Sequence, residues 1–340
     1  MRGANKRGFG HHLHDLFGGV FTKIGLIDVD GHNFPNLALM RISAYHKARG
    51  DDVEWWWTDL IHYDIVYMSK IFSSAYSPDV PEPMNADRVI KGGTGYCISL
   101  GADGKEVFDQ SKNTKLPDEI ERMFPDYSIY PQFDFAVAMT SRGCPRGCNF
   151  CHVAAKEGRC AVKVANVSDF WRPDIGKNHI EVLDPNITAC REKHDLFQQY
   201  AATKATVCFN QGIDIRMITD RDIADLNQIR LQKVHFAWDN PQDDLKRKFE
   251  DYAKGARWKY KGSFGMVYCL TNFEDVSVEE HIERALYRIE TLAALHYDPY
   301  IMVYNKPNAP KKIRDLQRWC NNKFIFKSCP RFEDYSQRKR

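Results

Sequence analysis

The sequence predicts an α/β protein in which a small parallel sheet precedes six further strand–helix units. Short apolar runs alternate with stretches of helical spacing along most of the 340 residues. Hydrophobic residues make up 43% of the chain and charged residues 27%, a composition that supports one large folded domain or two ordinary ones. A cysteine-rich loop directly follows one of the strand runs, and the other elements are arranged around it.

Composition narrows the setting in which the protein works. No apolar run reaches the roughly 20 residues of a membrane span, and the N-terminus lacks a basic region followed by an apolar core and a cleavage site. We therefore expect a cytoplasmic protein without a membrane partner. The ten cysteines are expected to stay reduced there. The net charge of +3 neither requires nor excludes a nucleic-acid partner.

Residues 1–22 are expected to form an N-terminal extension. Met1–Arg7 is basic, and the stretch after it is rich in glycine and histidine without periodicity. Its histidines offer metal ligands, although a solvated terminus is the more common meaning of such a stretch.

Residues 23–100 are expected to form a small Rossmann-like (flavodoxin-like) domain. A helix of apolar spacing, Asn36–Arg49, separates the first two apolar runs, and Gly50 ends it. The strand candidates are Lys23–Asp30, Asp52–Trp57, Tyr63–Ser69 and Arg88–Gly93. Strand–helix–strand alternation at this rhythm indicates an open parallel sheet, whose functional edge lies at the carboxyl ends of the strands.

The second half of the chain predicts an incomplete, TIM-like barrel. Residues 101–132 are polar and irregular, with a short helix near Pro117–Met123, and are expected to link the two domains. Residues 133–310 then contain six apolar runs, which are Phe133–Thr140, His179–Leu183, Ala205–Phe209, Lys233–Trp238, Phe264–Leu270 and Tyr300–Tyr304. Helical stretches at Ile187–Thr203, Thr219–Leu231 and Ser277–Leu295 lie between them. Six β/α units make a partial (β/α)6 barrel.

Residues 311–340 are basic and are expected to form a C-terminal helix and tail. Leu316, Trp319 and Phe324 indicate a helix that packs under the barrel. The cations there are compatible with a phosphate-binding surface, but a solvated charged face is the commoner reason for such a run. Cys320 and Cys329 lie close together in the sequence, which leaves a second metal site open.

The cysteine loop carries the strongest chemical signal. Cys144, Cys148 and Cys151 follow a Cys-x3-Cys-x2-Cys spacing in a loop rich in Gly and Pro. Thiolates this close can converge on one metal centre. A four-iron cluster held by only three thiolates leaves one iron open to a small molecule. The alternative is a zinc site completed by His152 or Cys160, or a set of ordinary thiols.

This loop resembles the signature of the radical S-adenosylmethionine (SAM) enzymes, in the Arg142-Gly143-Cys144 lead-in and in Phe150 before the last cysteine. The resemblance implies a 4Fe–4S cluster on Cys144, Cys148 and Cys151, whose open iron binds the amino and carboxylate groups of SAM. An electron from the cluster then cleaves SAM to a 5′-deoxyadenosyl radical. It also implies that Phe150 packs near the adenine, and that an external donor of flavodoxin or ferredoxin type supplies the electron.

Polar residues at the ends of the barrel strands are the candidates for binding SAM. The second strand ends in Asp184-Pro185-Asn186, which is similar to the Asp-x-Asn variant of cobalamin-type radical SAM enzymes. Asp184 is expected to accept from the SAM ammonium, and Asn186 to bind ribose or substrate. The third strand ends in Asn210 and Gln211, which are further candidates to face SAM or substrate.

The rest of the third strand end and the end of the fourth strand complete this set. Arg216 can hold the SAM carboxylate with two parallel hydrogen bonds, and Asp214 lies beside it; an internal Asp214–Arg216 salt bridge is the alternative. Asp239, after the fourth strand, is expected to bind the ribose hydroxyls. Tyr268 and Tyr304 are candidate radical neighbours, together with Gln211 and Asp214, although most strand tyrosines are packing residues.

The edge of the first sheet resembles the cobalamin-binding domain found before many radical SAM domains. That family uses Asp-x-His-x-x-Gly, Ser-x-Leu and Gly-Gly motifs, with the histidine reaching cobalt. The matching residues here are Asp30, His32, Ser69, Gly92 and Gly93. The first motif ends in Pro35 instead of glycine, and the second reads Ser69-Lys70-Ile71. The alternatives are that Asp30 and His32 only hydrogen-bond the turn, or that this edge binds substrate.

Several functions remain open. One is a cobalamin-dependent methyl transfer or rearrangement, and another is modification of a peptide or small metabolite. A third is modification of a nucleic acid, by a distant resemblance to methylthiotransferases. Only Cys97 precedes the cluster loop, which disfavours the second cluster that sulfur insertion uses. A zinc-binding or degenerate scaffold is the non-enzymatic alternative.

Overall fold

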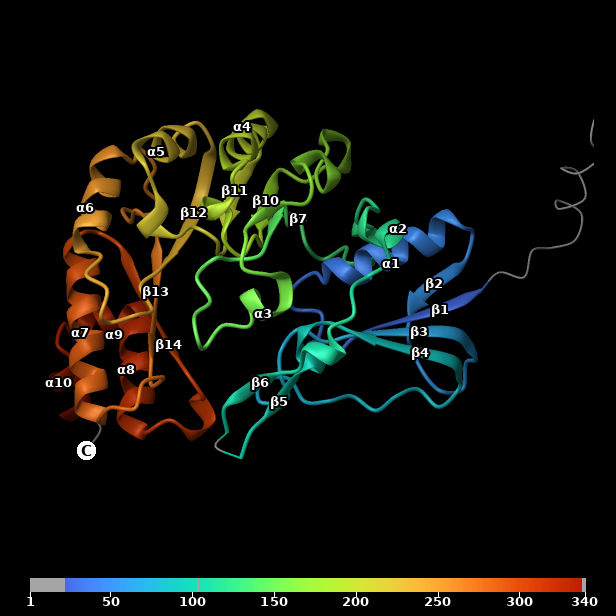
Figure 1. Ribbon diagram of the computed structural model, residues 1–340, viewed down its shortest axis with the longest axis horizontal. Helices are drawn as coiled ribbons and strands as arrows, with labels where there is room; N and C mark the ends of the chain where they lie inside the picture. Colours follow the sequence, from blue (N-terminus) through green and yellow to red (C-terminus); the bar gives the residue numbers. More distant parts are fainter. Residues whose placement is uncertain (1–21, 103, 338–340) are drawn as a thin grey trace, which may run out of the picture.

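The computed structural model describes residues 22–102 and 104–337, and it contains a four-stranded and a six-stranded parallel sheet (Figure 1). Six strands form an arc with helices along its outer side, and a four-stranded sheet lies beside the open side of this arc. The segment that carries the three cysteines and α3 (Val153–Glu157) lies between them. Met1–Phe21, which hold most of the predicted extension and its histidines, are outside the described residues.

The small sheet has the order β2-β1-β3-β4, with all its strands parallel. Its strands are β1 (Lys23–Asp28), β2 (Asp52–Trp55), β3 (Tyr63–Ser69) and β4 (Ala86–Gly92). Asn36 caps the N-terminus of helix α1 (Leu37–Ala48), and its side chain accepts from the backbone N–H of Leu39. The predicted strands and helix are confirmed. In the described chain, no α-helix connects β2 to β3 or β3 to β4, so helices cover one face of this sheet.

The predicted linker is packed onto the small sheet. It contains part of a hairpin, β5 (Ile98–Leu100) with β6 (Glu106–Phe108), and helix α2 (Asp118–Glu121). Ile120 of α2 packs against α1 and the sheet in one apolar cluster. The hydroxyl of the buried Tyr130 donates to Asp28 at the end of β1, at 2.6 Å. Residues 101–132 therefore complete the small domain.

The large sheet has the order β14-β13-β12-β11-β10-β7, again all parallel, which confirms the partial (β/α)6 barrel. Its strands are β7 (Ala136–Ala138), β10 (His179–Val182), β11 (Thr206–Phe209), β12 (Arg230–Ala237), β13 (Met266–Thr271) and β14 (Asp298–Val303). The outer helices are α4 (Lys193–Thr203), α5 (Asp220–Leu226), α6 (Lys246–Gly255) and α7 (Val278–Ala294). The sequence prediction lacked α6, in which only Phe249 and Tyr252 are buried.

The C-terminal segment forms α8 (Lys311–Asn321), α9 (Lys323–Ser328) and α10 (Phe332–Gln337). Leu316 and Trp319 are buried as predicted. The prediction that Phe324 packs under the barrel is wrong, because it lies on α9, beyond the Asn322 cap, and is 88% exposed. None of the described helices is both long and apolar enough to cross a membrane.

Four of the cations predicted for a phosphate-binding surface are in ion pairs. Lys312 pairs with Glu279 and Lys323 with Asp298, while Lys311 and Arg331 pair with acids of their own segment. Cys320 and Cys329 are buried, and each thiol donates to a backbone carbonyl. Neither cysteine belongs to a group of three metal-capable side chains in the described chain, so both are core thiols there.

Candidate functional site

The cysteine loop begins directly after β7, at the carboxyl end of the barrel. The short strands β8 (Ser141–Arg142) and β9 (Val162–Lys163) pair antiparallel and close the loop at its base. The loop is also narrow near its start. Gly143 has a φ of +85°, and a Cβ there would lie 2.1 Å from the carbonyl oxygen of Cys160. Only glycine fits this close approach.

The carboxylate of Asp184 holds the start of this loop. It is fully buried and accepts four hydrogen bonds, from the N–H and hydroxyl of Thr140 and from the N–H and hydroxyl of Ser141, at 2.6–2.8 Å. Burial raises its pKa to about 6, and the four donors oppose that rise. The ends of β7 and β10 lie side by side, so this carboxylate bonds the loop entrance. A contact between Asp184 and the SAM ammonium stays a prediction.

A glycine from the next strand end allows this arrangement. Gly212 follows β11 with a φ of +88°, and a Cβ at this position would lie 2.2 Å from the carbonyl oxygen of Asp184. The chain after β11 passes so close to the backbone of Asp184 that position 212 must be a glycine.

The three cysteines are free thiols whose sulfur atoms do not all lie within 4.8 Å of one another. A tetrahedral zinc site needs sulfur–sulfur distances of about 3.8 Å, given Zn–S bonds of about 2.3 Å. In the described chain, no group that joins these cysteines with His152 or Cys160 brings its ligand atoms within 4.8 Å of one another, so this arrangement does not form a zinc site. Burial raises the pKa of Cys148 and of Cys151. Three separated soft donors around one loop suit a larger iron–sulfur cluster.

Asn186 contacts the first of these cysteines. Its amide nitrogen lies 3.4 Å from the sulfur of Cys144, and only 3% of the residue is exposed. The turn after β10 directs the amide toward the loop. The predicted contact with ribose or substrate stays a prediction.

Arg216 forms the internal salt bridge that the sequence left as the alternative. It contacts both carboxylate oxygens of Asp214, at 2.7 and 3.2 Å, and also Asp243 at 3.0 Å. Asp214 also accepts from Arg146 of the cysteine loop at 2.9 Å. Although burial opposes ionisation, these two guanidinium groups lower the pKa of Asp214. Instead of holding the SAM carboxylate, Arg216 joins Asp214 and Arg146 in an ion-pair network, the Arg146–Asp214–Arg216 brace, which links the loop to the third strand end.

The remaining strand-end candidates are less enclosed. Asn210 donates to Glu181, and Gln211 donates to the carbonyl oxygen of Leu183 at 3.1 Å. The Tyr268 ring stacks on His235 with 5.4 Å between ring centroids, and burial raises its pKa to about 12. Tyr304 packs against Phe273. A role for these side chains beside a radical stays a prediction.

A cavity of about 370 Å³ lies beside the cysteine loop. Its wall includes Cys148 and Phe150 of the loop, and Asp239, Thr271 and Phe273 from the ends of β12 and β13. Phe150 and Phe273 meet edge to face, with 5.3 Å between ring centroids. The cavity is large enough for a small organic ligand, and both apolar and polar side chains line it.

Two polar groups on this wall point to a ligand. The hydroxyl oxygen of Thr271 is buried and has no hydrogen-bond partner among the described residues, and the residue is only 4% exposed. Buried hydroxyls normally have a partner, so an absent molecule explains this one best. Asp239 accepts from the N–H of Leu270 through one oxygen only, and burial raises its pKa to about 6. Its other oxygen is available to a ligand hydroxyl.

Arg288 was missed by the sequence prediction, although it shapes this wall. It is 2% exposed and donates to the backbone carbonyls of Trp238 and Asp239, at 2.7 and 3.2 Å, and to that of Leu270 at 3.0 Å. It therefore ties the ends of β12 and β13 together. A cation within the apolar stripe of α7, which contains Ala285 and Leu292, was the available signal.

At the carboxyl edge of the small sheet, the side chains of Asp30 and Ser69 accept hydrogen bonds from other residues of the same domain. Asp30 accepts from the backbone N–H groups of Ile71 and Phe72, and Ser69 accepts from Asn36. His32 is exposed and packs against the Trp55 ring at 4.3 Å between centroids. Gly93 approaches Lys70 so closely that a Cβ would lie 2.2 Å from its carbonyl oxygen, whereas nothing lies within 4 Å of a Cβ on Gly92. A corrin contact for these five residues stays a prediction.

This edge faces the cysteine loop. Glu106 of β6 accepts from Ser73, beyond β3, and contacts His152, next to Cys151. Lys156 of α3 donates to Thr94, beyond β4, at 2.6 Å. These contacts bring the carboxyl ends of both sheets to the same region, as the position of α3 in Figure 1 also shows.

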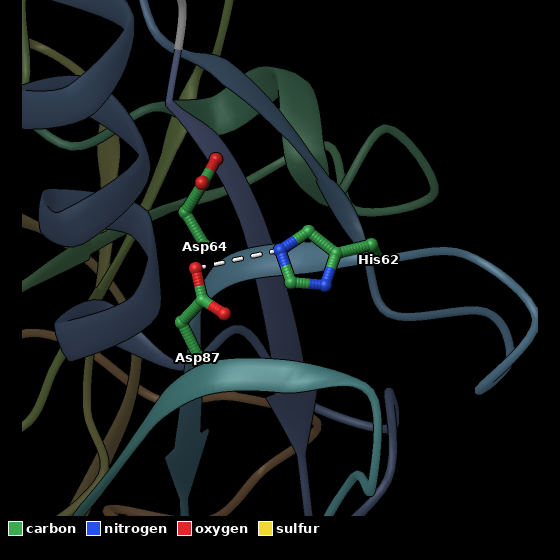
Figure 2. Close-up of side chains that lie close together, drawn as sticks. All are labelled: His62, Asp64 and Asp87. Atoms are coloured by element: carbon green, nitrogen blue, oxygen red, sulfur yellow. Dashed lines mark ion pairs between the residues drawn. The ribbon is translucent and has the colours of Figure 1, made fainter.

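A second group of metal-capable side chains lies elsewhere. His62, Asp64 and Asp87 lie near the starts of β3 and β4, and their ligand atoms fall within 4.8 Å of one another (Figure 2). The nearest charged pair is His62 with Asp87, at 3.4 Å. This is the opposite end of the small sheet from the edge that faces the cysteines, and Asp64 already accepts from the backbone N–H of Lys23.

Comparisons with known proteins identify the fold. No protein-family model and no curated protein sequence matches the chain. Two matching solved structures are of the radical S-adenosylmethionine methyltransferase TsrM from Kitasatospora setae, one with cobalamin and a 4Fe–4S cluster and one with tryptophan substrate and the SAM analogue aza-SAM. Both have a TM-score of 0.59 and 10% identity, over 83% of this chain and 75% and 72% of theirs. At this identity the likeness shows a shared fold.

The Gly212 crossing can be tested with a matched pair of substitutions. Gly212→Ala should lower the free energy of unfolding by about 2 to 4 kcal/mol, since left-handed strain and a backbone clash add. Gly262→Ala has nearly the same φ, +86°, but nothing within 4 Å of the new Cβ, so it should cost only about 1 kcal/mol. Urea denaturation of both variants measures the difference, and equal losses would contradict the close approach.

Proposed function

We propose that this protein is a radical SAM enzyme, with a 4Fe–4S cluster on Cys144, Cys148 and Cys151 and SAM in the adjoining cavity. The observation that carries the proposal is the joint position of the three thiols and the cavity wall. The loop that supplies Cys148 also supplies Phe150, and the unpartnered Thr271 hydroxyl lies on the same wall. The likeness in fold to TsrM supports it further.

The residues of the cavity divide the recognition of SAM between them. The rings of Phe150 and Phe273 offer an apolar surface for the adenine. Asp239 would accept from the ribose hydroxyls through its free oxygen, and Thr271 would bond a polar atom of the nucleoside. Arg288 holds Asp239 in place by its backbone.

When bound, the cluster supplies the electron that breaks a carbon–sulfur bond of SAM and leaves a 5′-deoxyadenosyl radical, which abstracts hydrogen from a substrate. The chain positions these reactants. Asp184 fixes the start of the loop, and the Arg146–Asp214–Arg216 brace fixes its middle. We propose a flavodoxin- or ferredoxin-type protein as the electron donor.

Cobalamin-dependent methyl transfer is the second candidate, and a specific observation favours it. Exposed apolar side chains gather at the carboxyl edge of the small sheet, which faces the cysteine loop; they are Phe34, Ile71, Phe72 and Tyr76, at 39–58% exposure. Such a surface beside a reactive site suits a large, partly apolar cofactor. The TsrM structure of the same fold contains cobalamin.

Sulfur insertion and nucleic-acid modification are less favoured. Cys97, the only cysteine before the loop, is 4% exposed, and burial raises its pKa, so it is a core thiol rather than a cluster ligand. Four of the C-terminal cations are paired with acids, which reduces the charge free for phosphates. A peptide or a small metabolite is therefore the better substrate class.

Anaerobic reconstitution tests the enzyme class. The wild type should bind iron and sulfide in equal amounts and, with a reductant, release 5′-deoxyadenosine from SAM. Cys148→Ser should lose most of the iron and all of the release, because two thiolates cannot hold the cluster. Cys269→Ser is the matched control, since Cys269 is a buried core thiol. Stoichiometric zinc without iron would overturn the proposal.

Spectroscopy tests the second candidate. If the small-sheet edge binds cobalamin, incubation with hydroxocobalamin and desalting should leave a corrin spectrum with the protein. Phe72→Glu should remove it by placing a charge on the apolar surface, and His32→Ala should shift its bands only if the imidazole reaches cobalt. An unretained corrin in the wild type would exclude this candidate while leaving SAM cleavage intact.

A further inference from the structure

The contact between Asn186 and Cys144 has a fixed direction. The side-chain oxygen of Asn186 faces the backbone N–H of Ala189, at 3.2 Å, and a backbone N–H can only donate. The hydroxyl of Thr188 lies 2.8 Å from the same oxygen and donates to it. The atom that faces the Cys144 sulfur at 3.4 Å is therefore the amide nitrogen, a donor.

Burial and neighbouring hydrogen bonds fix the orientation of the Asn186 amide. Asn186 is 3% and Thr188 1% exposed, so water does not compete for either group. Thr188 accepts from the N–H of Asp214 at 3.0 Å. Its own hydrogen has two acceptors nearby, and the Asn186 oxygen at 2.8 Å is closer than the carbonyl oxygen of Gly212 at 3.4 Å. Asp214 is in turn fixed by Arg146 and Arg216. The donor cannot turn away from the sulfur without breaking this chain of bonds.

We propose that Asn186 sets the reduction potential of the cluster by donating a hydrogen bond to the thiolate of Cys144. The inference rests on the proposed function, since it requires a cluster on that cysteine. One electron added to the cluster increases the negative charge on its sulfur ligands. An N–H aimed at one of them stabilises the reduced state, which raises the potential. Asn186 is a positioning and tuning residue that does not touch the substrate.

Two substitutions separate the hydrogen bond from the turn that holds it. Asn186→Asp keeps an oxygen for Ala189 but places a carboxylate oxygen against the sulfur. Asn186→Ser can still cap the turn, but its side chain is too short to reach Cys144. The matched control is Asn322→Asp, which makes the same change in charge. Asn322 also caps a helix, because its side chain accepts from two backbone N–H groups at the start of α9.

The readout is the midpoint potential of the reconstituted cluster, from a redox titration followed by electron paramagnetic resonance (EPR), with iron and sulfide measured on each sample. We expect the wild type and Asn322→Asp to share one potential. Asn186→Ser should be more negative, and Asn186→Asp more negative still. If Asn186→Asp loses its iron, Asn186→Ser decides the question.

Two results would overturn the inference, and they differ from each other. If the wild type and both Asn186 variants hold full iron at one common potential, the hydrogen bond has no tuning role, while the proposed function stands. If the wild type itself takes up no cluster, the proposed function fails and this inference fails with it.

Discussion

The buried carboxylate of Asp184 is the interaction on which the candidate site depends. A carboxylate without water is costly unless several donors surround it, and Thr140 and Ser141 supply four. Those two residues lie at the start of the cysteine loop, so the hydrogen bonds to Asp184 also fix where the loop leaves the barrel. Removing the carboxyl group would leave buried backbone N–H groups at the loop entrance without a partner.

The short segment Asp184–Asn186 thus acts on the loop twice. Asp184 holds its start, and Asn186 faces the sulfur of its first cysteine. On the other side, Glu121 of α2 accepts from Arg142 in the loop and from Arg41 of α1, both at 2.6 Å. The barrel and the small domain therefore clamp the same loop, and the carboxyl ends of both sheets meet at it. A reactive site at this junction can draw ligands from either domain.

Much of the fold could be predicted because parallel strands buried on both faces appear as continuous apolar runs. The strands of both large sheets were found in this way, and the spacing of Cys144, Cys148 and Cys151 located the loop. Helix α6 was missed because it buries only two side chains along a charged stretch. Phe150 and Asp239 were predicted for the SAM site, and both line the cavity.

The partners of the polar strand-end residues could not be predicted. Asp184 and Arg216 follow buried strands, as ligand-binding residues often do, but the register of neighbouring strands decides what meets them. Val182 pairs with Ala138, which places Thr140 and Ser141 against Asp184. Thr271 and Arg288 join the site from elements far along the chain, and only a folded structure reveals that the Thr271 hydroxyl has no hydrogen-bond partner among the described residues.

The central claim is that three thiolates at the mouth of the barrel hold a cluster that is open to SAM. EPR of the reduced cluster, recorded with and without SAM, tests it most directly. Coordination of SAM to an open iron changes the electronic structure of the cluster, so the account predicts a clear shift of the g-values on addition of SAM. A reduced-cluster spectrum that SAM leaves unchanged, or the absence of any cluster signal, would contradict it.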